Sequence, residues 1–199
     1  MTESDDEREL IESCRAGRVD AFGILVARYQ DRLYPTALRL TGHPDDALDV
    51  LQDAFLRAFE KLGKFKGESS FYTWVYRITV NLALSQRRKR RVVGRQAGEL
   101  GDPADDATRS DPSRPLDDFE RDQFVQMALN ALAPEHRAVV VMKEFDGLKY
   151  EEIAVTLDIP VGTVRSRLHR ARLELRDRLK NLVEFNLPTT QQLPPGESG

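Results

Sequence analysis

The chain has 199 residues, which is room for one large domain or two small ones. Hydrophobic residues make up 40% and charged residues 32%, so we expect a soluble protein with a buried core, and the few aromatic residues (8%) favour helices over strands. The single cysteine, Cys14, excludes an internal disulfide and fits a reducing compartment. The acidic N-terminus has no apolar signal core, and no apolar run is long enough to cross a bilayer, so we expect a cytoplasmic protein without a membrane contact.

The charge is strongly segregated along the chain, although the net charge is only -3. Residues 96–118 carry seven acids and two bases, whereas residues 162–180 carry seven bases and two acids. A further basic run, RRKRR, occupies residues 87–91. Separate basic segments of this kind favour contacts with an anionic partner such as nucleic acid.

Two helices are expected in the first third of the chain. The first contains apolar residues at the spacing of a helix face, and Pro35 and Gly42 punctuate the chain after it. The second begins near Asp45, where acids suit the positive end of a helix dipole, and runs to about Leu62. Its expected buried face consists of Leu48, Leu51, Phe55, Phe59 and Leu62.

A polar loop at residues 63–70 (GKFKGESS) precedes a third helix that ends in the RRKRR run. Ser69 or Ser70 is a suitable cap for this helix. Aromatic rings beside positive charge suit stacking on single-stranded nucleic acid. Phe71 and Trp74 lie on the apolar stripe and are expected in the core. The candidates for base contact are therefore Phe65, Lys66, Glu68, Ser69, Tyr72 and Tyr76.

Residues 92–118 are rich in Gly, Pro, Asp, Ser and Ala, and cannot bury enough apolar surface to offset their ordering entropy. We therefore expect an all-α protein in which a flexible acidic linker joins two small helical domains. The predicted domains span residues 1–91 and 119–180, and residues 181–199 are expected to form a disordered tail.

The segment from Lys149 to Lys180 has the pattern of a helix-turn-helix. A short amphipathic helix is followed by a tight break at residues 158–160 and by a second, basic helix from Val161. The apolar positions of that helix are Val161, Val164, Leu168, Ala171, Leu175 and Leu179. This pattern predicts a recognition helix for the major groove of double-stranded DNA, and the alternative is an ordinary helix with a solvated basic face.

The polar side of this helix supplies the candidate DNA contacts. Arg165, Ser166, His169 and Arg170 point away from the apolar face, and arginine can bind guanine bidentately. Thr163 and the helix N-terminus suit phosphates or base edges. The remaining bases, expected mostly on phosphates, are Arg167, Arg172, Arg176 and Arg178.

Enzymatic motifs are weak in this sequence. His43, His136 and His169 share no metal-ligand spacing, and neither a P-loop nor a GxSxG motif occurs. The acids near residues 45–53 favour a solvated or protein-binding helix face over a metal site. We expect no catalytic residue, metal, cofactor or small-molecule substrate.

Three stretches together resemble bacterial sigma factors of the extracytoplasmic-function (ECF) type, group 4 of the sigma-70 family. Residues 45–67 (DDALDVLQDAFLRAFEKLGKFKG) are similar to the core of region 2, and residues 68–91 to its promoter-melting and -10-reading part. Residues 132–172, including GTVRSRLHRAR, are similar to region 4. Two departures are Lys149, where a capping hydroxyl or acid is common, and Asp158, where a turn glycine is common. Aspartate tolerates the left-handed conformation better than most residues.

The resemblance implies a promoter-specificity subunit of RNA polymerase that has no catalytic role. Its first domain would bind the clamp coiled coil of the largest polymerase subunit, and its second would bind the flap. The implied polymerase contacts are Asp49, Gln52, Asp53 and Arg57. The implied -10 and upstream DNA contacts are Phe65, Lys66, Ser69, Tyr72, Tyr76, Arg77, Asn81, Arg87, Arg88 and Arg90. The implied -35 contacts are Thr163, Arg165, Ser166, Arg167, His169, Arg170 and Arg172.

The resemblance implies two further contacts, and two other functions remain as alternatives. The acidic linker would thread the positive RNA path of the polymerase. An inhibitory anti-sigma factor is common in the family, although no motif here shows one. The alternative is an autonomous helix-turn-helix regulator that binds duplex DNA without polymerase, but the first domain has no role in such a protein. An enzyme acting on nucleic acid is a third reading that lacks a catalytic set.

Overall fold

In the computed structural model, residues 3–97 and 116–186 are described, and every regular element among them is helical. This confirms the all-α prediction. The elements are α1 (Glu3–Arg15), α2 (Val19–Thr41), α3 (Pro44–Glu60), the short 3-10 turn η1 (Leu62–Lys64), α4 (Phe71–Ala97), α5 (Leu116–Asn130), α6 (Pro134–Val140), the π-helical turn η2 (Val141–Phe145), α7 (Tyr150–Leu157) and α8 (Val161–Asn186).

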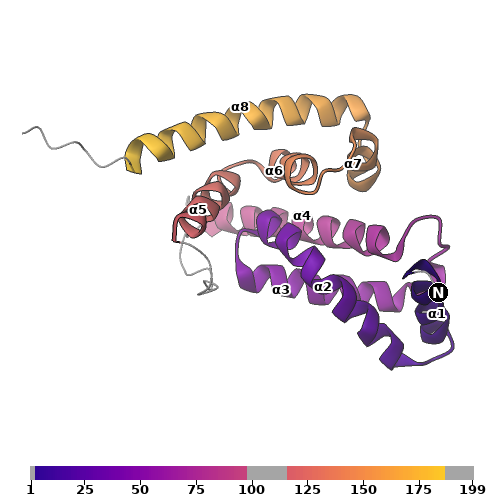
Figure 1. The fold of residues 1–199 in the computed structure, drawn as a ribbon. Coiled ribbons are helices and arrows are strands. Elements are labelled where there is room, and N and C mark those ends of the chain that lie inside the picture. Colours follow the sequence, from indigo (N-terminus) through magenta and orange to yellow (C-terminus); the bar gives the residue numbers. More distant parts are fainter. Residues whose placement is uncertain (1–2, 98–115, 187–199) are drawn as a thin grey trace, which may run out of the picture.

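The first helical unit is formed by α1 to α4, with α2 packed against both α3 and α4 (Figure 1). Its core contains the fully buried side chains of Leu25, Leu33, Phe71, Val75 and Val80. These residues recur at helical spacing in α2 and α4, so one apolar face of each helix turns inward. Of the two core residues expected in α4, Phe71 is fully buried and Trp74 is partly buried.

Two expectations for this unit are wrong. Pro35 lies inside α2 and does not end it. The proline removes one hydrogen-bond donor, but burial of Leu33 and Ala37 on either side holds the helix against its neighbours. Leu48 and Phe59, predicted on the buried face of α3, are 53% and 38% exposed. The inward-facing row of that helix runs instead through Val50, Leu51, Ala54, Phe55 and Ala58.

Helix bounds also differ from the predicted domain bounds. Helix α4 continues to Ala97 rather than ending at residue 91, and α5 begins at Leu116 rather than Phe119. Helix α8 continues to Asn186, so residues 181–186 do not belong to a disordered tail. No proline interrupts either extension, and the single Gly94 costs only about 1 kcal/mol in a helix. The rest of the predicted linker and tail, residues 98–115 and 187–199, lies outside the described residues.

The second helical unit places α6 and α7 beneath α8, and α5 also contacts α8 (Figure 1). Val139, Val140, Ile153, Val164 and Leu168 are buried between these helices. Each helix is too short or too polar to be stable alone, so this shared core holds the unit together.

The two units are packed against each other, with α6 and α7 between α8 and α4 (Figure 1). The fully buried Arg137 of α6 donates from Nη1 to the carbonyl of Leu40 at 3.1 Å. Gly42, with φ +87°, ends α2 at this contact, where a Cβ would lie 2.3 Å from Oδ1 of Asn130. The sequence predicted a linker between two domains and gave no sign of this direct contact.

Candidate nucleic-acid interface

The turn between α7 and α8 sets the direction of the predicted recognition helix. Helix α7 begins after Lys149, whose backbone N–H donates to the Glu152 carboxylate at 2.6 Å. Because a lysine side chain cannot accept a hydrogen bond, Glu152 provides only this half of a capping box. Helix α7 ends at Asp158, which is left-handed (φ 53°, ψ 52°), as the sequence predicted. The carbonyl of Pro160 then accepts the Val164 N–H (3.1 Å) in the first turn of α8.

The two sides of α8 differ sharply in burial. Val164, Leu168 and Ala171 are buried against the rest of the second unit. The four residues predicted to face the bases, Arg165, Ser166, His169 and Arg170, are all exposed. The helix therefore presents a continuous polar row on the side opposite its core contacts.

The other predicted -35 residues of α8 are either partly buried or bonded to another side chain. Thr163 and Arg167 are half-buried. Arg172 is engaged within its own unit, because its Nε and Nη2 donate to the Glu144 carboxylate of η2 at 2.9 and 2.6 Å. An exposed ion pair of this kind contributes little stability, so it does not prevent a phosphate contact.

The loop between η1 and α4 has a buried start and an exposed middle. Phe65 is only 9% exposed, and its ring packs against Trp74 (5.0 Å between centroids) and Phe71 (6.0 Å). The structure thus corrects the expectation for Phe65, whose ring is part of the aromatic core and has no free face for a base. Lys66 is exposed and Ser69 is half-buried.

Ser70 provides the cap of α4, one of the two serines predicted for this role. Its Oγ accepts the backbone N–H of Thr73 at 3.1 Å, and Gly67 (φ +73°) allows the chain to turn back toward it. The loop is therefore short and ends in a well-formed helix start.

The predicted base-contacting tyrosines of α4 have different surroundings. The ring of Tyr72 is half-buried and lies 4.3 Å from the guanidinium carbon of Arg32, and burial raises the pKa of its phenol. Tyr76 is only 3% exposed, and its hydroxyl donates to Asp146 at 2.6 Å. Asp146 also accepts a hydrogen bond from Thr36 Oγ1 at 3.0 Å. Tyr76 is therefore inaccessible to DNA in this arrangement, because the second unit covers it.

The basic end of α4 also contacts the second unit. Arg87 donates to the carbonyls of Thr41, in the first unit, and Asn130, in the second (3.3 Å from Nη2). Arg88 Nε lies 3.7 Å from a carboxylate oxygen of Glu135. Of the remaining predicted residues, Arg77 is half-buried and Asn81 is exposed, while the side chain of Arg90 lies outside the described part of the structure.

Comparison with known proteins decides the family. The profile described as "Sigma-70 region 2" matches residues 25–92, and that described as "Sigma-70, region 4" matches residues 125–175. The RNA polymerase sigma-H factor of Pseudomonas aeruginosa is 35% identical over 193 residues, which cover 92% of this chain and 98% of that protein. The ECF RNA polymerase sigma-E factor of Escherichia coli K12 is 35% identical over 190 residues, covering 92% and 99%.

The chain belongs to the sigma-70 family. Its relatives place it among the ECF sigma factors, which direct RNA polymerase to promoters and are initiation factors without catalytic activity. The fold agrees. The sigma factor RpoE of Bartonella quintana, solved in complex with the anti-sigma factor NepR, has a TM-score of 0.64 and 29% identity, covering 80% of this chain and 96% of that one. CnrH, solved with the cytosolic domain of CnrY, has a TM-score of 0.60 and 26% identity, covering 92% and 99%.

In this sigma factor, α3 of region 2 exposes a mixed polar and apolar surface. The residues predicted to contact polymerase, Asp49, Gln52, Asp53 and Arg57, are all exposed. The neighbouring row adds two apolar side chains that sequence reasoning did not assign to an interface: Leu48 is 53% exposed and Leu56 is 55% exposed. Both lie four residues from Gln52, and this spacing on one helix face is the signal that was missed. Exposed leucines within a polar rim are typical of a protein-binding surface.

The described ranges of the sigma factor contain neither a candidate metal site nor a membrane-spanning helix. No cluster of three or more His, Cys, Asp or Glu side chains there could hold a metal ion. None of the helices described combines the length and the apolar character needed to span a bilayer. Cys14 is buried, and burial raises the pKa of its thiol, which disfavours the nucleophilic thiolate.

Proposed function

We propose that this sigma factor reads the -35 element with α8 and the -10 element with α4 and the loop before it, while α3 docks on the clamp coiled coil of core RNA polymerase. It acts in the cytoplasm, where promoter DNA lies, and supplies no catalytic group to RNA synthesis. The main support for the proposal is that each of the two units exposes polar residues, and that these units match regions 4 and 2 of the family.

The -35 part rests on the exposed row of α8. Arg165, Ser166 and His169 are exposed within the N-terminal half of the helix, which is the part that enters the major groove in helix-turn-helix proteins. The ring of Tyr150 lies 5.8 Å from the guanidinium carbon of Arg165, which limits the directions that this side chain takes. A restrained arginine loses less entropy when it binds a guanine edge.

The -10 part rests on the loop from Lys66 to Ser69. Its exposed and half-exposed side chains offer hydrogen-bond donors and acceptors beside an aromatic core. Extruding a base from the duplex costs a few kcal/mol, so the contacts made by this loop must offset that cost. The basic end of α4 would hold the upstream phosphates, with Arg87 and Arg88 as its described members.

Reading the -10 element requires the two units to separate. Tyr76 is buried by Asp146, and Arg87 is bonded to Asn130, so the face of α4 that would meet DNA is covered. Region 4 must also bind upstream while region 2 binds the -10 element, so the two units must lie apart on the promoter. Binding to polymerase, which holds the two regions at separate sites, supplies the energy for opening.

An anti-sigma protein is a further proposed partner. The support is that a sigma factor of the same fold, RpoE of Bartonella quintana, was solved with the anti-sigma factor NepR. In this chain the exposed leucines of α3, Leu48 and Leu56, would serve such a protein as they would serve the polymerase.

The deciding experiment combines the purified chain, core polymerase and promoter DNA at one fixed salt concentration, because phosphate contacts make affinity depend on salt. We expect specific initiation by the reconstituted holoenzyme and weak binding of promoter by the chain alone. Tight, specific promoter binding without polymerase, together with no added initiation, would instead establish the autonomous regulator.

The polymerase contact has a separate test on α3. Asp53→Ala should weaken binding to core polymerase and leave thermal unfolding unchanged, because the side chain is exposed and makes no core contact. Asp20→Ala, an exposed acid in the first turn of α2, is the matched control. Unchanged binding of the Asp53 variant would remove this residue from the interface.

A further inference from the structure

Helix α1 has no role in the functions assigned so far. It spans Glu3–Arg15, and the match to sigma region 2 begins only at residue 25. Yet α1 contacts both η1 and α2, and so lies beside the loop proposed to capture a base. Two of its charged side chains reach that loop.

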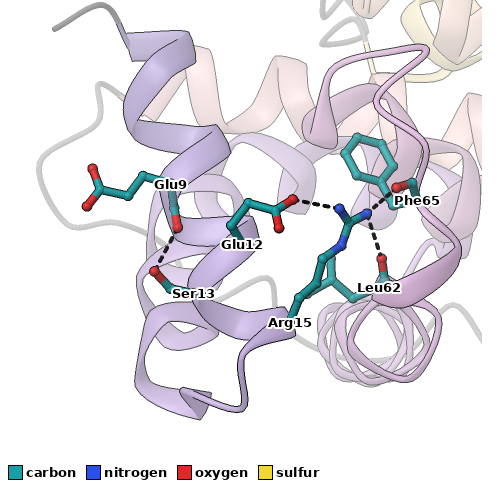
Figure 2. A network of polar contacts seen from close by, with 6 residues as sticks. All are labelled: Glu9, Glu12, Ser13, Arg15, Leu62 and Phe65. Atoms are coloured by element: carbon teal, nitrogen blue, oxygen red, sulfur yellow. Dashed lines mark hydrogen bonds and ion pairs between the residues drawn. The ribbon is translucent and has the colours of Figure 1, made fainter.

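Arg15, at the C-terminal end of α1, holds the start of the loop (Figure 2). Its Nη2 donates to the backbone carbonyls of Phe65 and Leu62, the latter at 3.3 Å. Its Nη1 donates to Glu12 at 2.7 Å, which fixes the plane of the guanidinium. Hydrogen bonds from a charged donor to a carbonyl are stronger than neutral ones. The loop therefore leaves η1 from an anchored point.

Glu7, two turns earlier in α1, holds the other end. One carboxylate oxygen accepts the backbone N–H of Phe71, the first residue of α4, at 3.3 Å. The other oxygen accepts the hydroxyl of Tyr29 in α2. The Tyr29 ring in turn packs on Phe71, with centroids 5.9 Å apart. A carboxylate at a helix N-terminus is also favourable for the helix dipole.

The middle of the loop contrasts with its ends. Lys66, Gly67 and Glu68 are exposed, and the hydrogen bond of Ser69 Oγ runs only to the neighbouring carbonyl of Ser70 (3.4 Å). A short loop fixed at both ends and free in the middle samples few conformations, so its side chains are held ready for a ligand.

We propose that α1 positions the base-capture loop, and that Arg15 and Glu7 are positioning residues that set how strictly the loop discriminates among bases. The proposal rests on the base capture proposed above. Neither residue touches DNA, and both act through the backbone at the two ends of the loop. Loss of either anchor lets the loop accept wrong bases, because its contacts no longer converge on one geometry.

The test is transcription by reconstituted holoenzyme from promoters that carry each of the four bases at every -10 position. The measured quantity is discrimination, the ratio of initiation with the best base to initiation with the others. Arg15→Gln removes the charged donor from both loop carbonyls and should lower discrimination about fivefold to tenfold at the captured position, which is part of what these bonds contribute. Preference at -35 and affinity for core polymerase should not change.

Three further variants separate positioning from general folding. Arg15→Lys keeps a charged donor and should restore part of the discrimination. Glu7→Ala, at the other end of the loop, should lower the same ratio. Arg8→Gln, an exposed arginine on the same helix, is the matched control and should behave as wild type. Thermal unfolding of each variant is measured in parallel.

The outcomes distinguish this inference from the function on which it rests. Lys66→Ala and Ser69→Ala report whether the loop captures a base at all. If these two lower discrimination while Arg15→Gln and Glu7→Ala do not, the role of α1 is overturned and base capture stands. If none of the four changes the ratio, base capture by this loop is itself wrong. An equal loss of initiation for all bases in Arg15→Gln, in step with a lower unfolding temperature, reduces Arg15 to a structural residue.

Discussion

Helices α8 and α4 are both basic and both proposed to meet DNA, but only α8 is ready to do so. The reading row of α8 lies opposite a core made within its own unit, so Arg165 and His169 are exposed whatever the rest of the chain does. The upstream face of α4 is shared with the other unit, which buries Tyr76 and engages Arg87. A helix that packs on one face leaves its polar side exposed to DNA. A helix that packs on two sides can bind DNA only after one of its neighbours has moved away.

The contact that covers α4 includes buried polar groups beside an apolar core that both units share. Asp146 accepts hydrogen bonds from Tyr76 and Thr36, and Arg137 is fully buried with a bond to the Leu40 carbonyl. Such groups lose hydration when they are buried, and their hydrogen bonds mainly offset that loss. Contacts between units of one chain are commonly of this reversible kind. The polar part of this contact therefore makes closure specific while adding little to the cost of opening.

The largest expected effect is on the exposed helix. Arg165→Ala should relax base preference at one -35 position by about 1–3 kcal/mol, roughly 5- to 150-fold, because a bidentate arginine–guanine pair is lost. The measurement is initiation from promoters varied across the -35 element. Arg176→Ala, on the exposed C-terminal half of α8, is the control and should weaken all sequences alike. An equal loss on every sequence in the Arg165 variant would place this residue on phosphate.

An effect of the same order is expected at the covered helix. Asp146→Ala removes the acceptor for both Tyr76 and Thr36 and should weaken the contact between the units by about 1–3 kcal/mol. Small-angle X-ray scattering should show a larger radius of gyration, and fluorescence transfer between labels on the two units should fall. Asp177→Ala, an exposed acid of α8, is the control. An unchanged radius would mean that the apolar part of the contact suffices.

Tyr76→Phe is a finer version of the same test. It keeps the ring in place and removes only the hydroxyl that donates to Asp146 at 2.6 Å. We expect a weakening of about 0.5–1.5 kcal/mol, below that of Asp146→Ala, because Thr36 still donates to the carboxylate. The same scattering measurement checks it. If opening in this variant equals that of Asp146→Ala, the Thr36 bond contributes nothing.

The smallest expected effect is a pH dependence of closure. Burial raises the pKa of Asp146, and the hydrogen bonds from Tyr76 and Thr36 and the charge of Arg39 only partly oppose it. The closed state thus binds a proton more tightly than the open state. The extra stability of the closed state is fully present below the ordinary pKa of an aspartate, and it is lost as the pH rises through the raised pKa of Asp146.

The radius of gyration should therefore grow as pH rises through that window. Asp146→Asn cannot titrate and should remove this dependence, while Asp53→Asn, on the exposed face of α3, should retain it. The same slope in the Asp146 variant would assign the effect to other groups.

The sequence predicted what depends on local patterns. Periodicity located the core faces of α4 and α8, and the turn at Asp158 located the helix-turn-helix. It missed Phe65, because a single aromatic residue in a polar loop carries no periodic signal. It also missed the bonds of Arg15, since every residue has a backbone carbonyl and no side-chain identity marks the acceptor.

The contact between the two units could not be predicted from the sequence either. Asp146 accepts hydrogen bonds from residues 110 and 70 positions away in the chain. The sequence around Thr36 or Tyr76 does not indicate a hydrogen-bond acceptor in the other unit. Polar pairs formed at such separations depend on how two finished units fit together. The exposed leucines of α3, by contrast, share one helix face with Gln52 in the sequence, although Leu48 was predicted to be buried.

The second unit, which covers α4, belongs to the same chain as the surface that it covers. Two units on one chain meet at an effective concentration that is commonly in the millimolar range. A promoter present at a few copies per cell competes poorly against such a neighbour, even when the contact between the units is weak. A ligand that binds both units at once does not have this disadvantage, because its two binding sites are also linked to each other. Duplex DNA alone does not offer that double contact to a closed molecule, but the proposed docking of both units on polymerase would, so promoter occupancy should follow the supply of free polymerase.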